Sequence, residues 1–247
     1  MMLRPPMSSP SGVSAGMVAR RVLSGVRWLA CLALLPASAL AVNDFSVAEQ
    51  AIFMDHHLSQ LKPPLTLRYT FRKSGSLEAA FEDKVELDLT AKPDGTCCAA
   101  SPRFLTGIHA AKQPEVEGID ANPAILYFLE RDIREMERLT QGKANYFRKR
   151  IRMAIYQGAT IRSLNLPYRG KLVAVQEITV SPYQDDPNRS RYDKLANKQY
   201  VFMLADVPGG LYGIRTKISA ALPDMPPLLL EEMLLDSAIP LQPKPKP

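Results

Sequence analysis

Two adjacent histidines, His56 and His57, are the first residues along the chain that have the chemistry of a base or a metal ligand. On a helix, neighbouring side chains diverge by about 100°, so the two imidazoles are poorly placed to bind one metal ion together. His109 is distant in sequence, and the spacings H-E-x-x-H and C-x-x-C do not occur. We therefore predict no metal site, and keep His56 and His57 as candidate catalytic bases.

A candidate nucleophile follows two residues later. Ser59 begins the sequence Ser59-Gln60-Leu61-Lys62, which fits S-x-x-K, a pattern in which a lysine helps to activate a serine. The companion motifs S-D-N and K-T-G are absent, and Pro63 follows directly. No glycine fingerprint of nucleotide or dinucleotide binding is present either, so we predict no cofactor. Ser59 remains a candidate for a hydrolase whose active site the sequence does not place.

Cys97 and Cys98 are adjacent. In an oxidising compartment two thiols usually pair, but adjacent cysteines close only a strained ring. On a strand their side chains point to opposite faces. The alternatives are burial as small apolar residues, a disulfide between neighbours, or a redox or metal role.

A basic cluster stands later in the chain, formed by Arg148, Lys149 and Arg152. On a helix these residues lie away from the apolar stripe, where they could bind an anionic ligand such as a lipid headgroup, a phosphate or an acidic partner. A solvated helix face, or ion pairs with acids of a neighbouring helix, is the alternative.

Two consecutive helices are predicted to carry this cluster, between Asn122 and Gly158. Asn122 is a favourable N-cap, and Pro123 fits the first helical position. Gly142 and Gly158 are suitable C-terminal stops. Apolar residues recur at helical spacing in both segments: Leu126, Leu129, Ile133 and Met136, then Phe147, Ile151, Ala154 and Ile155.

Strands are predicted on both sides of the helical pair. Residues 65–71 and 85–89 alternate apolar and polar side chains, and the turn residues between them indicate a hairpin. Two helices are expected outside this pattern, at residues 46–62 after the capping box of Ser46 and at the apolar segment 228–235. Further strands are expected at residues 96–107, 160–166, 172–180, 200–204 and 211–218.

These elements predict an α+β fold: an antiparallel sheet, for which strong curvature is one option, that the central pair of helices covers. Curved antiparallel sheets closed by helices serve as lipid and lipoprotein carriers in bacterial envelopes, and this comparison is one of architecture alone.

Residues 1–41 have the pattern of a secretory signal peptide, with arginines before a short apolar run and Ala39-Leu40-Ala41 as the cleavage site. Residues 1–16 are interpreted as lying upstream of the true start. We expect a single domain over residues 42–239 and a disordered tail rich in proline and lysine over residues 240–247. Cleavage after Ala41 predicts a periplasmic or secreted protein, with a lipoprotein as the less favoured alternative. No later segment is long and apolar enough to span a membrane.

The basic balance of the whole chain, +6, comes largely from the leader. Four of the 31 lysines and arginines precede residue 42 and none of the 25 acids do, which leaves 27 basic and 25 acidic residues, or +2. A nucleic-acid-binding function loses its main support.

Two functions from different classes follow. The first is a non-enzymatic envelope protein that binds a protein partner, or an apolar or anionic ligand, between sheet and helices. The second is a periplasmic hydrolase with an unplaced active site. A structural subunit of an envelope complex is a third possibility. A His–carboxylate–nucleophile cleft favours the enzyme, whereas an apolar groove favours binding.

Overall fold

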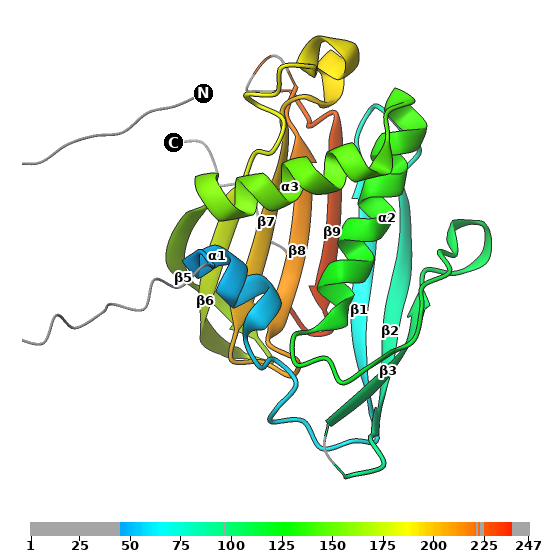
Figure 1. The fold of residues 1–247 in the computed structure, drawn as a ribbon, viewed down its shortest axis with the longest axis vertical. Helices are drawn as coiled ribbons and strands as arrows, with labels where there is room; N and C mark the ends of the chain where they lie inside the picture. The colour runs from blue at the N-terminus through cyan, green and yellow to red at the C-terminus, as the bar shows by residue number, and fades with distance from the viewer. Residues whose placement is uncertain (1–44, 96, 221, 223–224, 239–247) are drawn as a thin grey trace, which may run out of the picture. The chain divides into compact units, whose positions relative to one another are not determined.

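Nine β-strands of the described chain form one antiparallel sheet, with helices α1, α2 and α3 over one of its faces (Figure 1). The computed structural model describes residues 45–95, 97–220, 222 and 225–238, so the predicted leader and C-terminal tail lie outside the described residues. The strand order is β4-β3-β2-β1-β9-β8-β7-β6-β5. The predicted α+β fold is confirmed. The strands are β1 (Leu65–Ser74), β2 (Phe81–Ala91), β3 (Cys97–Phe104), β4 (Val116–Glu117), β5 (Thr160–Tyr168), β6 (Lys171–Val180), β7 (Lys198–Ala205), β8 (Leu211–Ile218) and β9 (Leu229–Leu235).

The helices lie before β1 and between β4 and β5, and short 3₁₀ turns occupy two loops. They are α1 (Val47–Glu49), which continues as the π-helical turn η1 (Gln50–Met54), α2 (Pro123–Thr140) and α3 (Ala144–Gly158), with the 3₁₀ segments η2 (Gly107–His109) and η3 (Arg189–Leu195).

β1 and β2 form the hairpin that their alternation predicts. Leu67 and Tyr69 are buried, whereas Arg68 between them is exposed. In the antiparallel register Leu67 pairs with Leu87 and Tyr69 with Val85. Because side chains alternate between the faces of a strand, this register places both apolar pairs on the helix-covered side.

The segment predicted as a helix at residues 228–235 is instead the central strand β9, so that prediction was wrong. A short apolar run does not by itself distinguish a buried strand from a buried helix. Here β1 and β8 pair with β9 on its two sides and satisfy its backbone groups. β9, the last strand in the sequence, thus joins strands β1–β4 to strands β5–β8 in one sheet.

The first helix ends earlier than the sequence indicates. Its capping box is present: the Ser46 hydroxyl accepts the Glu49 N–H at 3.1 Å, and the Glu49 carboxylate accepts the Ser46 N–H at 3.1 Å. The predicted helix over residues 46–62 nevertheless ends at Met54, and Asp55 has extended backbone. The His57 ring lies 2.9 Å from the Ala51 carbonyl and occupies an acceptor that a continuing helix would use.

α2 begins and ends with the polar caps that helix termini require. The Asn122 side chain accepts the Ala124 N–H at 3.0 Å, and Pro123 takes the first helical position. At the other end Gln141, not the predicted Gly142, is the left-handed C-cap with φ of 55°. Gly142 is needed for another reason, because a Cβ there would lie 2.7 Å from the Phe147 ring of α3. The absence of a side chain lets α3 turn back closely after α2.

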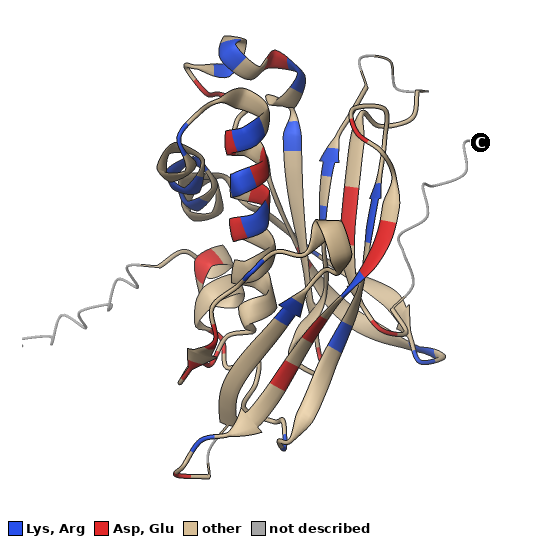
Figure 2. Cartoon of the chain, turned by 90° about the vertical axis from the view of Figure 1, so that its right-hand side faces the viewer, with Lys and Arg blue, Asp and Glu red and all other residues tan. Residues whose placement is uncertain are grey.

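Charged side chains join α2 to the sheet. Asp132 is fully buried, is paired with Lys198 of β7, and accepts a hydrogen bond from the Tyr200 hydroxyl at 2.6 Å. Arg131 donates to the buried carboxylate of Glu231 on β9 at 2.9 Å. Acidic and basic residues alternate along α2 and across neighbouring strands (Figure 2). The mixed charges of α2 are therefore partly an internal network rather than only a solvated face.

The long polar segment between β6 and β7 is held against α3. The buried carboxylate of Asp186 accepts hydrogen bonds from the hydroxyls of Tyr146 and Tyr192 and lies 3.2 Å from Arg150 Nε. Burial opposes ionisation, but these hydrogen bonds outweigh it and lower the pKa of Asp186. Asp186 therefore anchors this loop.

Candidate functional site: an apolar cavity between three helices

His57 is engaged on both ring nitrogens. Its Nδ1 accepts the backbone N–H of Asn122 at 3.1 Å, so the proton resides on Nε2, which donates to the Ala51 carbonyl at 2.9 Å. Burial lowers the pKa of His57 against the opposing effect of the hydrogen bond to Ala51. The neutral ring links the end of η1 to the start of α2.

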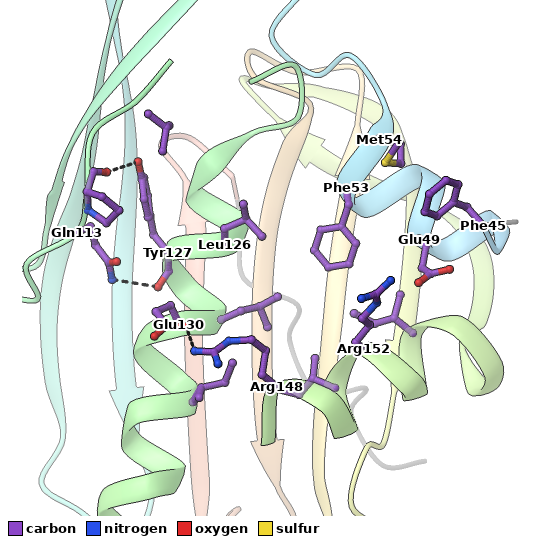
Figure 3. A pocket seen from close by; sticks show the side chains of 16 residues that line it. Phe45, Glu49, Phe53, Met54, Gln113, Leu126, Tyr127, Glu130, Arg148 and Arg152 are labelled. Carbon is purple, nitrogen blue, oxygen red and sulfur yellow. Dashed lines mark hydrogen bonds and ion pairs between the residues drawn. The ribbon is translucent and has the colours of Figure 1, made fainter. Parts of the chain in front are cut away.

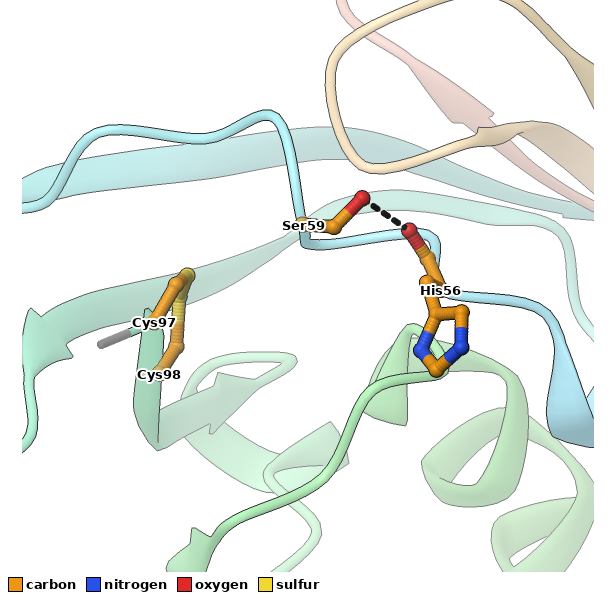
Figure 4. Close-up of a disulfide and its surroundings, with 4 residues drawn as sticks. All are labelled: His56, Ser59, Cys97 and Cys98. Carbon is orange, nitrogen blue, oxygen red and sulfur yellow. Dashed lines mark hydrogen bonds between the residues drawn. A yellow bond between two sulfur atoms is a disulfide. The ribbon is translucent and has the colours of Figure 1, made fainter.

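His56 and Ser59 lie close together but form no base–nucleophile pair. The Ser59 hydroxyl donates to the backbone carbonyl of His56 at 2.8 Å, not to its ring (Figure 4). The exposed His56 ring lies 3.2 Å from the Asp120 carboxylate. In the described chain no hydrogen bond joins Ser59 to an imidazole, and the structure does not bring His56, His57 and Ser59 into one catalytic arrangement.

Cys97 and Cys98 are joined by a disulfide at the start of β3 (Figure 4). On a regular strand the side chains of neighbours diverge, whereas here the two sulfur atoms are bonded to each other. Cys98 is fully buried and packs in the core. Of the alternatives left open by the sequence, the structure has the disulfide between neighbours.

A cavity of about 500 Å³ lies between α1–η1, α2, α3 and the segment that precedes β4 (Figure 3). Its volume falls within the range of about 300–1,000 Å³ typical of small-molecule sites. Eleven of its sixteen lining residues are apolar or aromatic: Phe45, Phe53, Met54, Pro114, Val116, Leu126, Tyr127, Leu129, Ile133, Ile151 and Ile155. The other five are Glu49, Gln113, Glu130, Arg148 and Arg152.

Three apolar side chains around this cavity are left open to solvent. Phe45, Met54 and Leu126 have exposed fractions of 47%, 48% and 44%. Met54 belongs to η1, Leu126 to α2, and Phe45 lies just before α1, yet all three line the same cavity. Scattered exposed apolar residues are normal, whereas their convergence on one concave surface is typical of a binding site.

The phase of α2 explains why this wall is apolar. One side of the helix faces the sheet, where Phe128 packs near Phe71 with ring centroids 6.2 Å apart. Leu126, Leu129 and Ile133 recur at i, i+3 and i+7 on the cavity side. The sequence identified this stripe but not the cavity that part of it lines.

The segment before β4 is tied to α2 by polar contacts. The Tyr127 hydroxyl donates to the Pro114 carbonyl at 2.8 Å, and the Gln113 amide donates to the Tyr127 carbonyl at 3.3 Å. These two hydrogen bonds hold one wall of the cavity in place (Figure 3).

The predicted basic cluster divides between the cavity and the surface. Arg148 and Arg152 are four residues apart on α3, line the cavity and are directed into it (Figure 3). Lys149 is exposed and does not line the cavity. The structure thus brings together two of the three candidate ligand-binding residues.

The carboxylates that line the cavity have partners. Glu130 accepts from Arg148 at 2.8 Å and from Arg134 at 3.4 Å. The Glu49 carboxylate belongs to the capping box of α1. Arg152 has no ion pair or side-chain hydrogen bond among the described residues.

The described part of the chain lacks two further kinds of feature. It contains no group of three or more His, Cys, Asp or Glu side chains arranged to hold a metal ion. None of its helices has the length and apolar character needed to cross a membrane.

The sequence alone did not point to Phe45, Phe53, Met54 or Val116 as site residues. Their roles depend on the early end of η1 and on the path of the segment before β4. The only signal in the sequence was the apolar character of residues 52–54 next to the capping box.

The fold and site define the class: an α+β protein with a helix-bounded apolar cavity over one face of an antiparallel sheet. No protein-family model matches the chain, and no curated protein matches its sequence. Among solved structures, it is similar to a LolA superfamily protein from Nitrosomonas europaea, at 10% identity and a TM-score of 0.21. The match covers 80% of this chain and 96% of that chain.

Proposed function

We propose that this protein is an exported, non-enzymatic binding protein that holds a hydrocarbon chain in the cavity between α1, α2 and α3. The observation that carries the proposal is the convergence of the exposed Phe45, Met54 and Leu126 on one apolar cavity of about 500 Å³. A bound chain would cover these side chains and remove apolar surface from water.

The free energy available supports a long chain rather than a short one. Each buried methylene contributes about 0.8 kcal/mol, so roughly fourteen methylenes contribute on the order of 11 kcal/mol. Association costs about 4–15 kcal/mol in lost freedom of motion. A chain of only six methylenes, at about 5 kcal/mol, barely offsets the lower end of that cost. Affinity should therefore rise steeply with chain length until the cavity is full.

A periplasmic location fits this function, because amphiphiles that cross the aqueous space between two membranes need a soluble carrier. The predicted leader supports export, and its cleavage after Ala41 is testable. The intact mass of the protein from a periplasmic fraction should correspond to a chain that begins at Val42. A chain that keeps residues 17–41 in the periplasm would contradict cleavage at this site.

The binding test uses an uncharged fluorescent probe, N-phenyl-1-naphthylamine, and two matched variants on α2. Leu126→Gln alters the cavity wall, whereas Leu139→Gln alters a leucine of the same helix that is 37% exposed and does not line the cavity. We expect the wild type and Leu139→Gln to bind the probe equally and Leu126→Gln to bind it about tenfold more weakly, since a polar amide replaces apolar contact surface. A wild-type protein that leaves the fluorescence of the probe unchanged would refute the proposed function.

A further inference from the structure

Arg152 differs from Arg148, the other basic residue of the cavity, because it forms no ion pair with a carboxylate of the described chain. Glu130 is paired with Arg148 and Arg134, and Glu49 accepts the Ser46 N–H in the capping box. Within the described chain Arg152 contacts no carboxylate. The cavity therefore presents one guanidinium that no ion pair engages, and it shares the lining with the Glu49 carboxylate, which accepts a backbone N–H.

The position of the Arg152 guanidinium suits the head-group end of a bound hydrocarbon chain rather than its middle. Arg152 is exposed and stands between the walls that α1–η1 and α3 contribute, with its guanidinium near Phe53 (Figure 3). Phe53 and Ile155 supply apolar surface beside it. A charged hydrogen bond beside apolar surface is stronger than one in open water.

We propose that the ligand of this cavity is a single-chain amphiphile with an anionic head group, and that Arg152 binds the head group while the apolar walls hold the chain. This inference rests on the proposed function and adds the class of ligand to it. A guanidinium can donate two parallel hydrogen bonds to a carboxylate or a phosphate, which a lysine ammonium cannot. Both head groups share this chemistry, and the experiment separates them.

The experiment measures displacement of N-phenyl-1-naphthylamine by three compounds with one chain length: dodecanoate, dodecyl phosphate and dodecan-1-ol. We expect the wild type to bind the two anions more tightly than the alcohol. Arg152→Gln should weaken binding of the preferred anion about tenfold, in keeping with the loss of a charged hydrogen bond. Binding of the alcohol should remain within about twofold, because its hydroxyl carries no charge.

Two further variants control for charge and geometry. Lys149→Gln removes the same charge from the same helix at a residue outside the cavity, and should leave all three affinities within about twofold, because exposed charges act weakly over distance. Arg152→Lys keeps the charge but loses the two-pronged donor, and should bind with intermediate affinity.

The outcomes distinguish this inference from the function on which it rests. If the probe and all three compounds fail to bind the wild type, the proposed function is wrong. If the probe and the alcohol bind but Arg152→Gln binds both anions as the wild type does, the cavity holds apolar chains and the role of Arg152 is wrong. A loss confined to dodecanoate or to dodecyl phosphate identifies the head group, and binding of the alcohol by Arg152→Gln shows that the variant retains an intact cavity.

Discussion

Replacing Lys198 with methionine removes the cation that pairs with Asp132 beneath α2. Both side chains are almost completely buried, with exposed fractions of 1% and 0%. Burial raises the pKa of Asp132, and the pull of Lys198 opposes that effect. In Lys198→Met the carboxylate keeps the hydrogen bond from Tyr200 but loses its counter-charge.

The size of the effect follows from the burial of the pair. Removing one partner of a buried ion pair typically costs about 3–5 kcal/mol, because the other charge stays buried without compensation. Exposed pairs contribute only about 0–1 kcal/mol. We therefore expect Lys198→Met to lose about 3–5 kcal/mol of unfolding free energy. The slope rises with chain size, and at about 3 kcal/mol per molar urea the midpoint should fall by roughly 1–2 M.

The assay is urea unfolding followed by far-UV circular dichroism, with the double variant Lys198→Met/Asp132→Asn as the control. Replacing both charges removes the Asp132 carboxylate as well, so the double variant should recover part of the lost stability. Glu231, which lies 3.8 Å from Lys198, stays buried and keeps its pair with Arg131. A loss of less than about 1 kcal/mol in Lys198→Met would show that this pair behaves as an exposed one. In that case our description of the α2–sheet contact would be wrong.

Three other stability predictions follow from single residues. Gly142→Ala should lose about 1–3 kcal/mol in urea unfolding because its Cβ meets the Phe147 ring, whereas Gly158→Ala, which meets nothing within 4 Å, should not be destabilised. Burial raises the pKa of Glu231, but the nearby cations outweigh burial and lower this pKa to about 2, below the usual 4.5. The stability that the ionised carboxylate contributes should therefore be lost as the pH falls from 4.5 towards 2. Glu231→Gln should flatten that part of an acid-unfolding curve. Burial lowers the pKa of His57 in the folded protein, so the free energy of unfolding should fall as the pH drops below 6.5. If His57→Ala shows the same dependence of unfolding free energy on pH between 7 and 5, this histidine is not the cause.

The hairpin and the central helices could be predicted because their signals are local. Alternation over residues 65–71 fixes which side chains face inward, and the N-cap Asn122 with Pro123 marks the start of α2. Strand β9 could not be predicted, because what makes it a strand is pairing with β1 and β8, which are distant in the sequence.

The cavity was only partly predictable for the same reason. The sequence identified Arg148 and Arg152 as a basic cluster, but it could not separate them from Lys149, since that depends on how α3 is rotated against α1. It also placed Leu126 on an apolar stripe with Leu129 and Ile133, but it could not show that the rotation of α2 leaves this leucine on an open cavity wall. Helix phase relative to neighbouring elements is a tertiary property that no short pattern records.

The central claim, that the cavity between α1, α2 and α3 holds a hydrocarbon chain, is tested most directly by native mass spectrometry of the protein purified from the periplasm. We expect the folded protein to carry a non-covalent amphiphile, identifiable after release by its fragmentation as a chain with a head group. The adduct should be depleted in Leu126→Gln and retained in Leu139→Gln. A wild-type protein that emerges without an adduct, and takes up none after incubation with dodecanoate, dodecyl phosphate or dodecan-1-ol, would contradict the claim.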